Sequence, residues 1–379
     1  MKMFYISGNN IMNTKKLLKK TLNLTLASIF SFSILGTSIS ANACSTVFLN
    51  QFDSVKVVGR NMDFMYPCDP VLMISPRGIH RIGSSNKDAL SWTSKYGSVI
   101  TVVHDIFTSE GINEKGLSAH AQAFTNKEQT INNIKGPVLD SNYWINYILD
   151  THETVQQVID DLSKIKMRAV FFPVTYPTDS KHIAIEDKTG DSAVIEIYHG
   201  RLNIYHGKDF NVMTNYPTLD QHIKAFKVSS KNNLPLDSGA VSRFIRLKNN
   251  LNAVPKPRSS QEALGYINSI INSAAFVIGQ PIPDEDQLFV EKYSQYASKK
   301  EELRGAATYW QTLSDLNNPA YYFKSISAEN YLKIDLKKID FEKLHNVKRL
   351  DNIMNIDSNN HINAIFTIQE GDIYSHYKK

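Results

Sequence analysis

The sequence has few of the residues that build disulfide frameworks or metal sites. Only two cysteines occur among 379 residues, which excludes a small domain held together by disulfides. The 11 histidines form no His-Glu-x-x-His pattern, no Cys-x-x-Cys pair occurs, and a glycine-rich phosphate loop is missing. The sequence therefore gives no support for a metal site or an organic cofactor, and we expect neither.

The chain has the composition of a packed globular protein. Hydrophobic residues make up 42% of it, aromatic residues 10% and charged residues 21%, which argues against extensive disorder and fibrous repeats. The formal net charge of +5 comes from 42 basic and 37 acidic residues. Five lysines and no acidic residue lie in residues 1–43, so the rest of the chain has 37 residues of each sign. This balance gives no indication of a nucleic-acid partner.

Residues 1–43 have the organisation of a secretory signal peptide. A cluster of four lysines at 15–20 precedes an apolar run at 22–39, and Ala41 and Ala43 occupy the two positions that a signal peptidase reads. The apolar run is short for a membrane span, and no basic stop follows it. We predict cleavage between Ala43 and Cys44, contact with the membrane only during export, and a periplasmic or secreted protein.

Cleavage at this position makes Cys44 the first residue of the mature chain. A cysteine there carries both a thiol and a free α-amine, whose unperturbed pKa is about 7.7–8.0. The amine can take the thiol proton, so the nucleophile and its base occupy one residue. Alternatively, Cys44 can pair with Cys68 in a structural disulfide, since exported proteins meet oxidising conditions. The position of Cys44 alone does not decide between the catalytic and the structural interpretation.

The residues after Cys44 predict a β-hairpin. Two runs rich in β-branched residues, 44–50 and 55–61, are separated by a turn at 51–54. Folding about this turn brings Cys44 opposite Arg60 and Asp63, where Arg60 would favour the thiolate and Asp63 would accept hydrogen bonds from the α-ammonium. Because a regular strand sends residues three apart to opposite faces, we predict a bulge or turn after Arg60. The simpler alternative is an exposed hairpin end with an ordinary ion pair.

Six segments follow one another in an order that is typical of a known family. They are CSTVFLNQFDSVKVVGRNMDF at 44–64, WTSKYGSV at 92–99, EGINEKGL at 110–117, VMTNYP at 212–217, SRFIR at 242–246 and TYWQTLSDLNNPAYYF at 308–323. Together they resemble the choloylglycine hydrolase family, the N-terminal-nucleophile amidases that include bile salt hydrolases and penicillin V acylases. Their number and order make the resemblance specific.

The resemblance implies a set of catalytic residues. Cys44 would be the nucleophile and general base, with Arg60 and Asp63 as its charged neighbours. Asn215 matches the family's oxyanion-hole asparagine, whose amide stabilises the tetrahedral intermediate. Arg243 matches the second arginine of the site. From the residues alone, Asn215 can equally be a turn residue before a proline, and Arg243 a surface residue.

The sequence departs from the bile salt hydrolase pattern at two places. Those enzymes carry an asparagine soon after the NEKGL motif, whereas this chain has Ala123 there, next to Gln122. The second oxyanion donor is therefore left open, and a backbone N–H near Ala123 or Asn61 could replace the missing side chain. Asn215 and Arg243 are also only 28 positions apart. In both departures, and in its signal peptide, the chain resembles the Gram-negative-type secreted branch of the family.

The remaining patterns predict a layered α+β fold. Short apolar runs at 183–187, 192–198, 202–206 and 211–214 indicate a meander of antiparallel strands that ends just before Asn215. Helical periodicity occurs at 142–149, 154–165 and 260–273, where Ser259 and Glu262 fit a capping box. Another helix face is formed by Ala240, Phe244, Leu247 and Leu251. The resemblance sharpens this to a four-layer αββα sandwich of the N-terminal nucleophile hydrolase type, with one domain over residues 44–379.

The predicted function is hydrolysis of a linear carbon–nitrogen amide bond through a thioester on Cys44. The expected substrate is an acyl amide with a bulky apolar acyl group, namely a conjugated bile salt, penicillin V or an N-acyl homoserine lactone. One alternative is a lipid amidase of the acid ceramidase type, and another is a non-catalytic secreted binding protein with a Cys44–Cys68 disulfide. A homo-oligomer, either a dimer or a tetramer, is a further expectation.

Overall fold

The computed structural model describes residues 44–124, 135–170, 181–230, 233–280, 306–355 and 367–368. The chain divides into two units, residues 1–39 and 40–379, and every described residue belongs to the second. The predicted signal peptide lies outside the described residues. Within the described ranges, no helix is long and apolar enough to cross a membrane.

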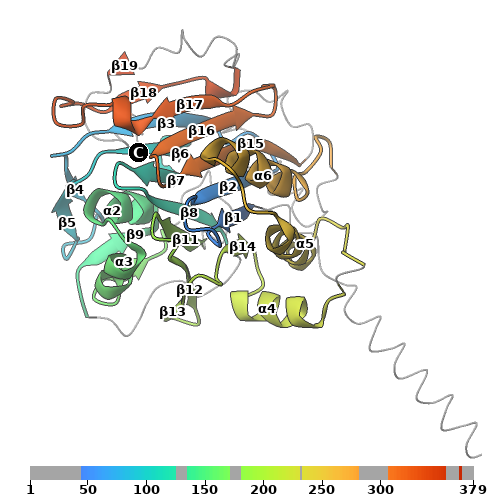
Figure 1. The fold of residues 1–379 in the computed structure, drawn as a ribbon. Coiled ribbons are helices and arrows are strands. Elements are labelled where there is room, and N and C mark those ends of the chain that lie inside the picture. Colours follow the sequence, from blue (N-terminus) through green and yellow to red (C-terminus); the bar gives the residue numbers. More distant parts are fainter. Residues whose placement is uncertain are drawn as a thin grey trace, which may run out of the picture. The chain divides into compact units, whose positions relative to one another are not determined.

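Two large β-sheets form the centre of the fold (Figure 1). The first sheet has six strands, in the order β14 (Val212–Thr214), β1 (Ser45–Leu49), β2 (Val57–Phe64), β15 (Ala307–Asp315), β16 (Ala320–Ser325) and β17 (Leu332–Asp335). The second sheet has nine described strands, in the order β13 (Arg201–His206), β12 (Ser192–Tyr198), β11 (Lys181–Asp187), β8 (Leu117–Ala123), β7 (Phe107–Asn113), β6 (Ser98–Val103), β3 (Pro70–Ser75), β18 (Lys348–Leu350) and β19 (Thr367–Ile368).

Helices cover the outer face of each sheet. The first sheet is covered by α5 (Ala240–Ala253) and α6 (Ser260–Asn272), with α4 (Leu219–Val228) packed against α5. The second sheet is covered by α2 (Trp144–Thr151) and α3 (Val155–Leu162). Two small sheets, β4 (His80–Ile82) with β5 (Ser91–Thr93) and β9 (Val138–Asp140) with β10 (Lys166–Arg168), flank this arrangement. The predicted four-layer αββα sandwich is confirmed.

Strand β1 is buried on both faces because it separates two apolar layers. Phe48 points into the layer between the two sheets, whereas Val47 and Leu49 point toward the helices. A strand with both faces covered is expected to be apolar without alternation, as its last three residues, Val47, Phe48 and Leu49, are. On the next strand, Gly59 faces α6 so closely that an added Cβ would lie 2.3 Å from Ile267 Cγ2. The two layers thus place β1 and its neighbour deep inside the molecule.

The predicted hairpin is confirmed, but the predicted bulge is wrong. Strands β1 and β2 pair antiparallel, with Ser45 opposite Asn61. Strand β2 runs without interruption from Val57 to Phe64, and the register shift lies in its other neighbour, β15, between Thr308 and Trp310. Arg60 and Asp63 therefore point to opposite faces of one regular strand, as the two-residue period of a β-strand requires.

The predicted meander is correct for three of its four strands. β11, β12 and β13 are consecutive neighbours in the second sheet, whereas β14 leaves them and pairs with β1 in the first sheet. The predicted end of a strand just before Asn215 is confirmed. Because β14 pairs with β1 and not with β13, Asn215 lies beside the N-terminal end of β1. A meander that continued in the second sheet would have placed Asn215 elsewhere.

The helix predictions from periodicity are confirmed at α2, α3, α5 and α6. Ser259 caps α6, with its side chain accepting a hydrogen bond from the Glu262 backbone N–H. On α5, Phe244, Leu247 and Leu251 are buried as the spacing predicted. Periodicity did not reveal α4, whose Thr218 and Gln221 form a complete capping box.

Candidate active site

Cys44 lies immediately before β1 and is 4% exposed. Both cysteines of the chain, Cys44 and Cys68, are free thiols, so the alternative prediction of a Cys44–Cys68 disulfide is wrong for this structure. Cys68 Sγ lies instead 3.4 Å from the carbonyl oxygen of Tyr66. The thiol of Cys44 is therefore available for chemistry rather than committed to a covalent bridge.

The sulfur of Cys44 faces the layer between the two sheets, on the same side as Arg60. Arg60 Nη2 lies 3.9 Å from Cys44 Sγ, and Met62 Sδ lies 3.4 Å from it. Burial raises the pKa of the Cys44 thiol above its ordinary value, and the nearby charge of Arg60 lowers it only in part. Arg60 thus acts in the predicted direction, but the thiol remains protonated at neutral pH until a base removes its proton.

A buried carboxylate that the hairpin did not predict neutralises Arg60. Glu110, on β7 of the opposite sheet, pairs with Arg60 at 2.5 Å between Oε1 and Nη1. Burial alone would raise the pKa of Glu110, but Arg60 and hydrogen bonds from His120 and Thr312 lower it to about 2. The other guanidinium nitrogen, Nη2, donates to the Ala121 carbonyl at 3.0 Å. The guanidinium is therefore held between the thiol of Cys44 and the second sheet.

Glu110 lies in a segment that carries the family resemblance, but the sequence does not reveal its part in the site. The residue opens the EGINEKGL motif, and it is an ionisable side chain within a fully buried strand. A buried charge requires a partner. A buried acidic residue thus indicates that a basic partner is near it. Nothing in the sequence identifies this partner as Arg60, which is 50 positions away.

Asp63 lies on the opposite face of β2 from Arg60, toward the helices. Its Oδ1 accepts a hydrogen bond from the Thr308 hydroxyl, which in turn accepts one from the backbone N–H of Phe276. Burial raises the pKa of Asp63 to about 7, although Arg243, Thr308 and Arg60 each act to lower it. Among the described residues, the buried Oδ2 atom of Asp63 has no hydrogen-bond partner. One oxygen of this carboxylate is therefore free to accept a proton donor near Cys44.

Arg243 connects three parts of the site from the first turn of α5. Its Nη1 donates to the carbonyl oxygen of Cys44 at 2.7 Å and to Ser45 Oγ at 2.6 Å. Its Nη2 donates to Asn215 Oδ1 at 3.1 Å. Burial lowers the pKa of Arg243 to about 10, against the opposing charge of Asp63. Arg243 is buried, so the alternative of a surface residue is wrong.

Asn215 is held at three atoms. Arg243 donates to its Oδ1, its Nδ2 donates to the carbonyl oxygen of Ala123 at 2.8 Å, and His222 Nε2 lies 2.8 Å from its backbone oxygen. The second N–H of the amide has no acceptor among the described residues. A fixed amide with one unused N–H is a suitable donor to an oxyanion.

Gln122 and Ala123 do not supply a side-chain donor at the expected place. Gln122 Nε2 donates to Thr46 Oγ1 at 2.6 Å, and Ala123 contributes its carbonyl oxygen to Asn215. The side chain of Asn61 is likewise engaged, because its Nδ2 donates to the Ile271 carbonyl oxygen. A backbone N–H as the second oxyanion donor thus stays a prediction.

The structure therefore brings all five predicted residues, Cys44, Arg60, Asp63, Asn215 and Arg243, to one end of the β1–β2 hairpin. Each of the five is buried. Within the described ranges, no group of three or more His, Cys, Asp or Glu side chains is arranged to hold a metal ion. The arrangement offers a thiol, two guanidinium groups, a carboxylate with a free oxygen and an amide donor.

Comparison with known proteins agrees with this geometry. Residues 44–229 match the family described as linear amide C–N hydrolases, choloylglycine hydrolase family, and the match begins at Cys44. Over 361 residues the chain is 30% identical to a penicillin V acylase of Pectobacterium atrosepticum, covering 87% of this chain and 89% of that one. Over 284 residues it is 26% identical to a bile salt hydrolase/transferase of Clostridium perfringens, covering 66% and 84% respectively.

Among solved structures, the chain is similar to penicillin V acylase from Agrobacterium tumefaciens. The TM-score is 0.69 and the sequence identity 27%, with 86% of this chain and 98% of the other covered. The likeness thus extends over nearly the whole fold as well as over the segment that contains Cys44.

Proposed function

Because the chain belongs to the choloylglycine hydrolase family of linear amide C–N hydrolases, we propose that Cys44 is the nucleophile of its amide hydrolysis. In this proposal, export removes residues 1–43 and leaves Cys44 as the N-terminal residue of a periplasmic or secreted enzyme. The new α-amine then serves as the base for the thiol. Neither a metal ion nor an organic cofactor takes part.

The reaction follows from the groups around the thiol. The α-amine accepts the proton of Cys44 Sγ, and the sulfur forms a bond to the amide carbonyl carbon. Asn215 donates its unused N–H to the oxyanion of the tetrahedral intermediate, together with a backbone N–H. The α-ammonium then gives its proton to the leaving amine as the carbon–nitrogen bond breaks. Water hydrolyses the resulting thioester, which releases the carboxylate and restores the thiol.

The observation that carries this proposal is the link that Arg243 makes between Cys44 and Asn215. One guanidinium donates to the carbonyl of Cys44 and to the amide oxygen of Asn215, so the nucleophile and the oxyanion donor are fixed relative to each other. Such fixed geometry is what amide hydrolysis requires, because a misplacement of the reacting atoms by about 1 Å can lower the rate by roughly 10²-fold.

The free oxygen of Asp63 supports the role of the α-amine. A buried carboxylate oxygen without a partner is costly, and an α-ammonium at Cys44 would supply the missing donor. Sulfur and nitrogen of one N-terminal cysteine would then be controlled from opposite faces of β2, by Arg60 and Asp63 respectively. This division explains why a regular strand without a bulge suits the site.

The proposed substrate is an acyl amide with a bulky apolar acyl group. The two curated relatives are named for penicillin V and for bile salts, and both compounds fit this description. Penicillin V is the first candidate, because its acylase has the higher identity and covers more of the chain. Conjugated bile salts and N-acyl homoserine lactones are the next compounds of the same class. A homo-oligomer remains part of the proposal.

A substrate panel with two cysteine variants tests the proposal. Penicillin V, a conjugated bile salt and a long-chain acyl homoserine lactone are assayed by kcat/KM with the processed wild-type enzyme. Cys44→Ser should lower kcat by several orders of magnitude while the protein still folds, because the hydroxyl is a poorer nucleophile. Cys68→Ser is the matched control, since it removes the other buried thiol. Equal activity in the two variants would refute the assignment of Cys44.

A further inference from the structure

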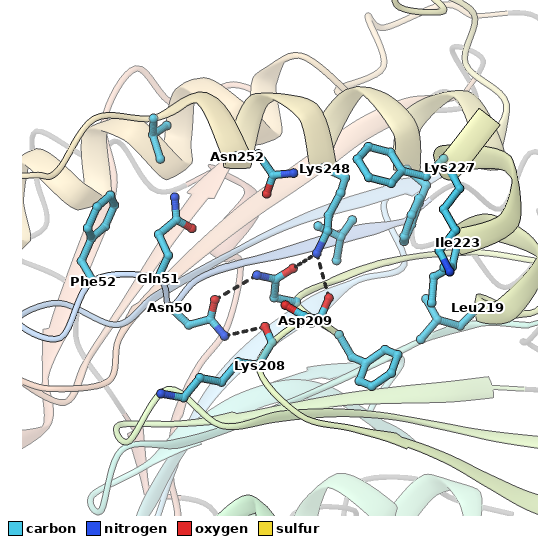
Figure 2. Close-up of a pocket in the computed structure, with 16 residues that line it drawn as sticks. Asn50, Gln51, Phe52, Lys208, Asp209, Leu219, Ile223, Lys227, Lys248 and Asn252 are labelled. Atoms are coloured by element: carbon cyan, nitrogen blue, oxygen red, sulfur yellow. Dashed lines mark hydrogen bonds between the residues drawn. The ribbon is translucent and has the colours of Figure 1, made fainter. Parts of the chain in front are cut away.

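A cavity lies at the opposite end of β1 from Cys44. Its volume is about 960 Å³, and it is bounded by the turn after β1, the loop between β13 and β14, and helices α4 and α5 (Figure 2). Asn50, which follows β1, lies at its edge. Six residues of extended chain separate this end from Cys44, which is roughly 20 Å at the rise of a β-strand. The cavity is therefore distinct from the site at Cys44.

The walls of the cavity combine apolar surface with positive charge. Apolar side chains come from every bounding element, and they include Phe52, Phe210, Leu219, Ile223, Phe226 and Phe244. Three lysines, Lys208, Lys227 and Lys248, line the same space with a single acidic residue, Asp209. Sites for small molecules typically have volumes of about 300–1,000 Å³, largely apolar walls and a few placed polar groups.

Lys248 extends from α5 toward the loop that carries Asp209 (Figure 2). Its Nζ donates to the backbone oxygen of Asp209 at 2.7 Å and to Asn211 Oδ1 at 2.5 Å. Both acceptors are neutral, and within the described ranges no carboxylate lies at ion-pair distance from Lys248. Burial lowers the pKa of Lys248, and the more distant carboxylate of Asp209 acts against this shift. An ammonium group has three N–H donors. A half-buried cation with neutral partners and one donor to spare is a complementary group for an anion.

One wall of the cavity is connected to the reacting groups by two contacts. The ring of Phe244 stacks on the imidazole of His222, with centroids 5.0 Å apart. His222 Nε2 donates to the carbonyl oxygen of Asn215 at 2.8 Å. Phe244 also follows Arg243 directly on α5. A molecule that displaces Phe244 therefore acts on the elements that hold Asn215.

We propose that this cavity binds a small amphipathic carboxylate, with its apolar body against the phenylalanines and its carboxylate on Lys248, and that occupancy alters turnover through Phe244, His222 and Asn215. The binding site stands on the geometry of the cavity alone. The effect on turnover rests on the proposed function.

Decanoate, at concentrations below those at which it forms micelles, is the probe for binding. Calorimetric titration uses the processed protein with Cys44→Ala, which removes the nucleophile and so prevents any turnover. Decanoate should bind at one site, and decyltrimethylammonium, with an equal chain and the opposite charge, should bind at least tenfold more weakly. Lys248→Gln should weaken decanoate binding about tenfold, the size expected for one charge-assisted hydrogen bond. Ile223→Trp should fill the cavity and abolish binding.

Two exposed positions provide matched controls. Lys343→Gln and Ile326→Trp make the same changes outside the cavity and should leave decanoate binding unaltered. Melting temperatures check that each variant is folded. Decanoate binding that is equal in Lys248→Gln, Ile223→Trp and the controls would place the ligand elsewhere and overturn the proposal. An equal affinity for both amphiphiles would refute the role of Lys248.

The effect on turnover is measured with the wild-type enzyme and whichever substrate of the panel it hydrolyses. Saturating decanoate should change kcat at least twofold, and this change should disappear in Ile223→Trp. A ligand that merely competes at Cys44 alters KM alone. An unchanged kcat would refute the coupling to Asn215. Failure of the enzyme to hydrolyse any panel compound would overturn the proposed function but leave the calorimetric result intact.

Discussion

Glu110, and not Asp63, is the counter-ion of Arg60. The two side chains meet between the sheets at 2.5 Å, and both are almost completely buried. Asp63, three residues from Arg60 in sequence, lies on the other face of β2. The two acidic residues thus differ in their contacts: Glu110 balances the guanidinium beside the thiol, whereas Asp63 keeps one carboxylate oxygen without a partner among the described residues.

This relationship predicts the effect of removing the charge of Glu110. Glu110→Gln should lower the free energy of unfolding by about 3–5 kcal/mol, because it leaves the guanidinium of Arg60 buried without a counter-ion. Urea unfolding monitored by circular dichroism measures the change. The matched control is Glu186→Gln, at a buried carboxylate in the same layer whose pKa is raised by burial. Its amide can still accept the Ser118 hydroxyl, and its other neighbour, His120 at 3.5 Å, keeps Glu110 as a partner, so the loss should be at most about 1 kcal/mol.

A double variant separates the charge from the packing. If the loss in Glu110→Gln comes from an unpaired guanidinium, Arg60→Met combined with Glu110→Leu should recover part of the stability, because no buried charge remains. Activity should stay low in that double variant, since Arg60 is beside the thiol. A double variant less stable than Glu110→Gln would contradict the electrostatic explanation.

The raised pKa of Asp63 predicts that the stability of the processed chain and that of the unprocessed chain depend differently on pH. Its pKa of about 7 lies above the ordinary value of 3.8, so the folded state binds the proton more tightly than the unfolded state. The associated stability is present below pH 4 and is lost as the pH rises toward 7, by an amount of the order of 4 kcal/mol. An α-ammonium at Cys44 would lower this pKa and cancel the loss.

Unfolding curves between pH 4 and 8 check this prediction on two proteins. One is the processed enzyme, and the other retains Ala43 and Asn42 ahead of Cys44. The extended protein should lose stability as the pH rises, and the processed protein should lose much less. Asp63→Asn should abolish the difference between the two, because an amide does not titrate in this range. Identical pH profiles before that substitution would rule out the contact between Asp63 and the α-ammonium.

Asn215 predicts a selective loss of kcat. Asn215→Asp keeps the oxygen that accepts from Arg243, but it removes both N–H donors and adds a negative charge where the oxyanion would form. We expect kcat to fall by at least about 10²-fold with a much smaller change in KM, as for other oxyanion donors. Steady-state kinetics on the best panel substrate provides the measurement. An increase in KM with unchanged kcat would indicate substrate binding instead.

The sequence was sufficient for the local part of the site. A two-residue period and a short turn specify the β1–β2 hairpin, and the hairpin alone brings Arg60 and Asp63 near Cys44. The helix that carries Arg243 followed from the spacing of its apolar residues. These features depend on short-range geometry, which periodicity reports directly.

The parts that sequence reasoning missed depend on pairing between distant segments. The partner of β14 is β1, more than 160 positions away, and nothing in the run 211–214 distinguishes this edge from a continued meander. The pairing of Arg60 with Glu110 likewise crosses from one sheet to the other. The raised pKa of Cys44 is a third case, since burial depends on layers that form only when both sheets are packed.

The last prediction concerns the proposed cleavage after Ala43, which would create the catalytic amine. N-terminal sequencing of the exported protein should read Cys-Ser-Thr, and the chain should be fully active. Ala43→Arg should block cleavage, because signal peptidases require a small residue at this position. The uncleaved protein should show no detectable turnover, since its Cys44 nitrogen is part of a peptide bond and cannot take the thiol proton. Asn42→Arg places the same side chain at the neighbouring position, which the peptidase does not read, and should be processed and active. Turnover by an uncleaved Ala43→Arg protein would show that the base is a different group.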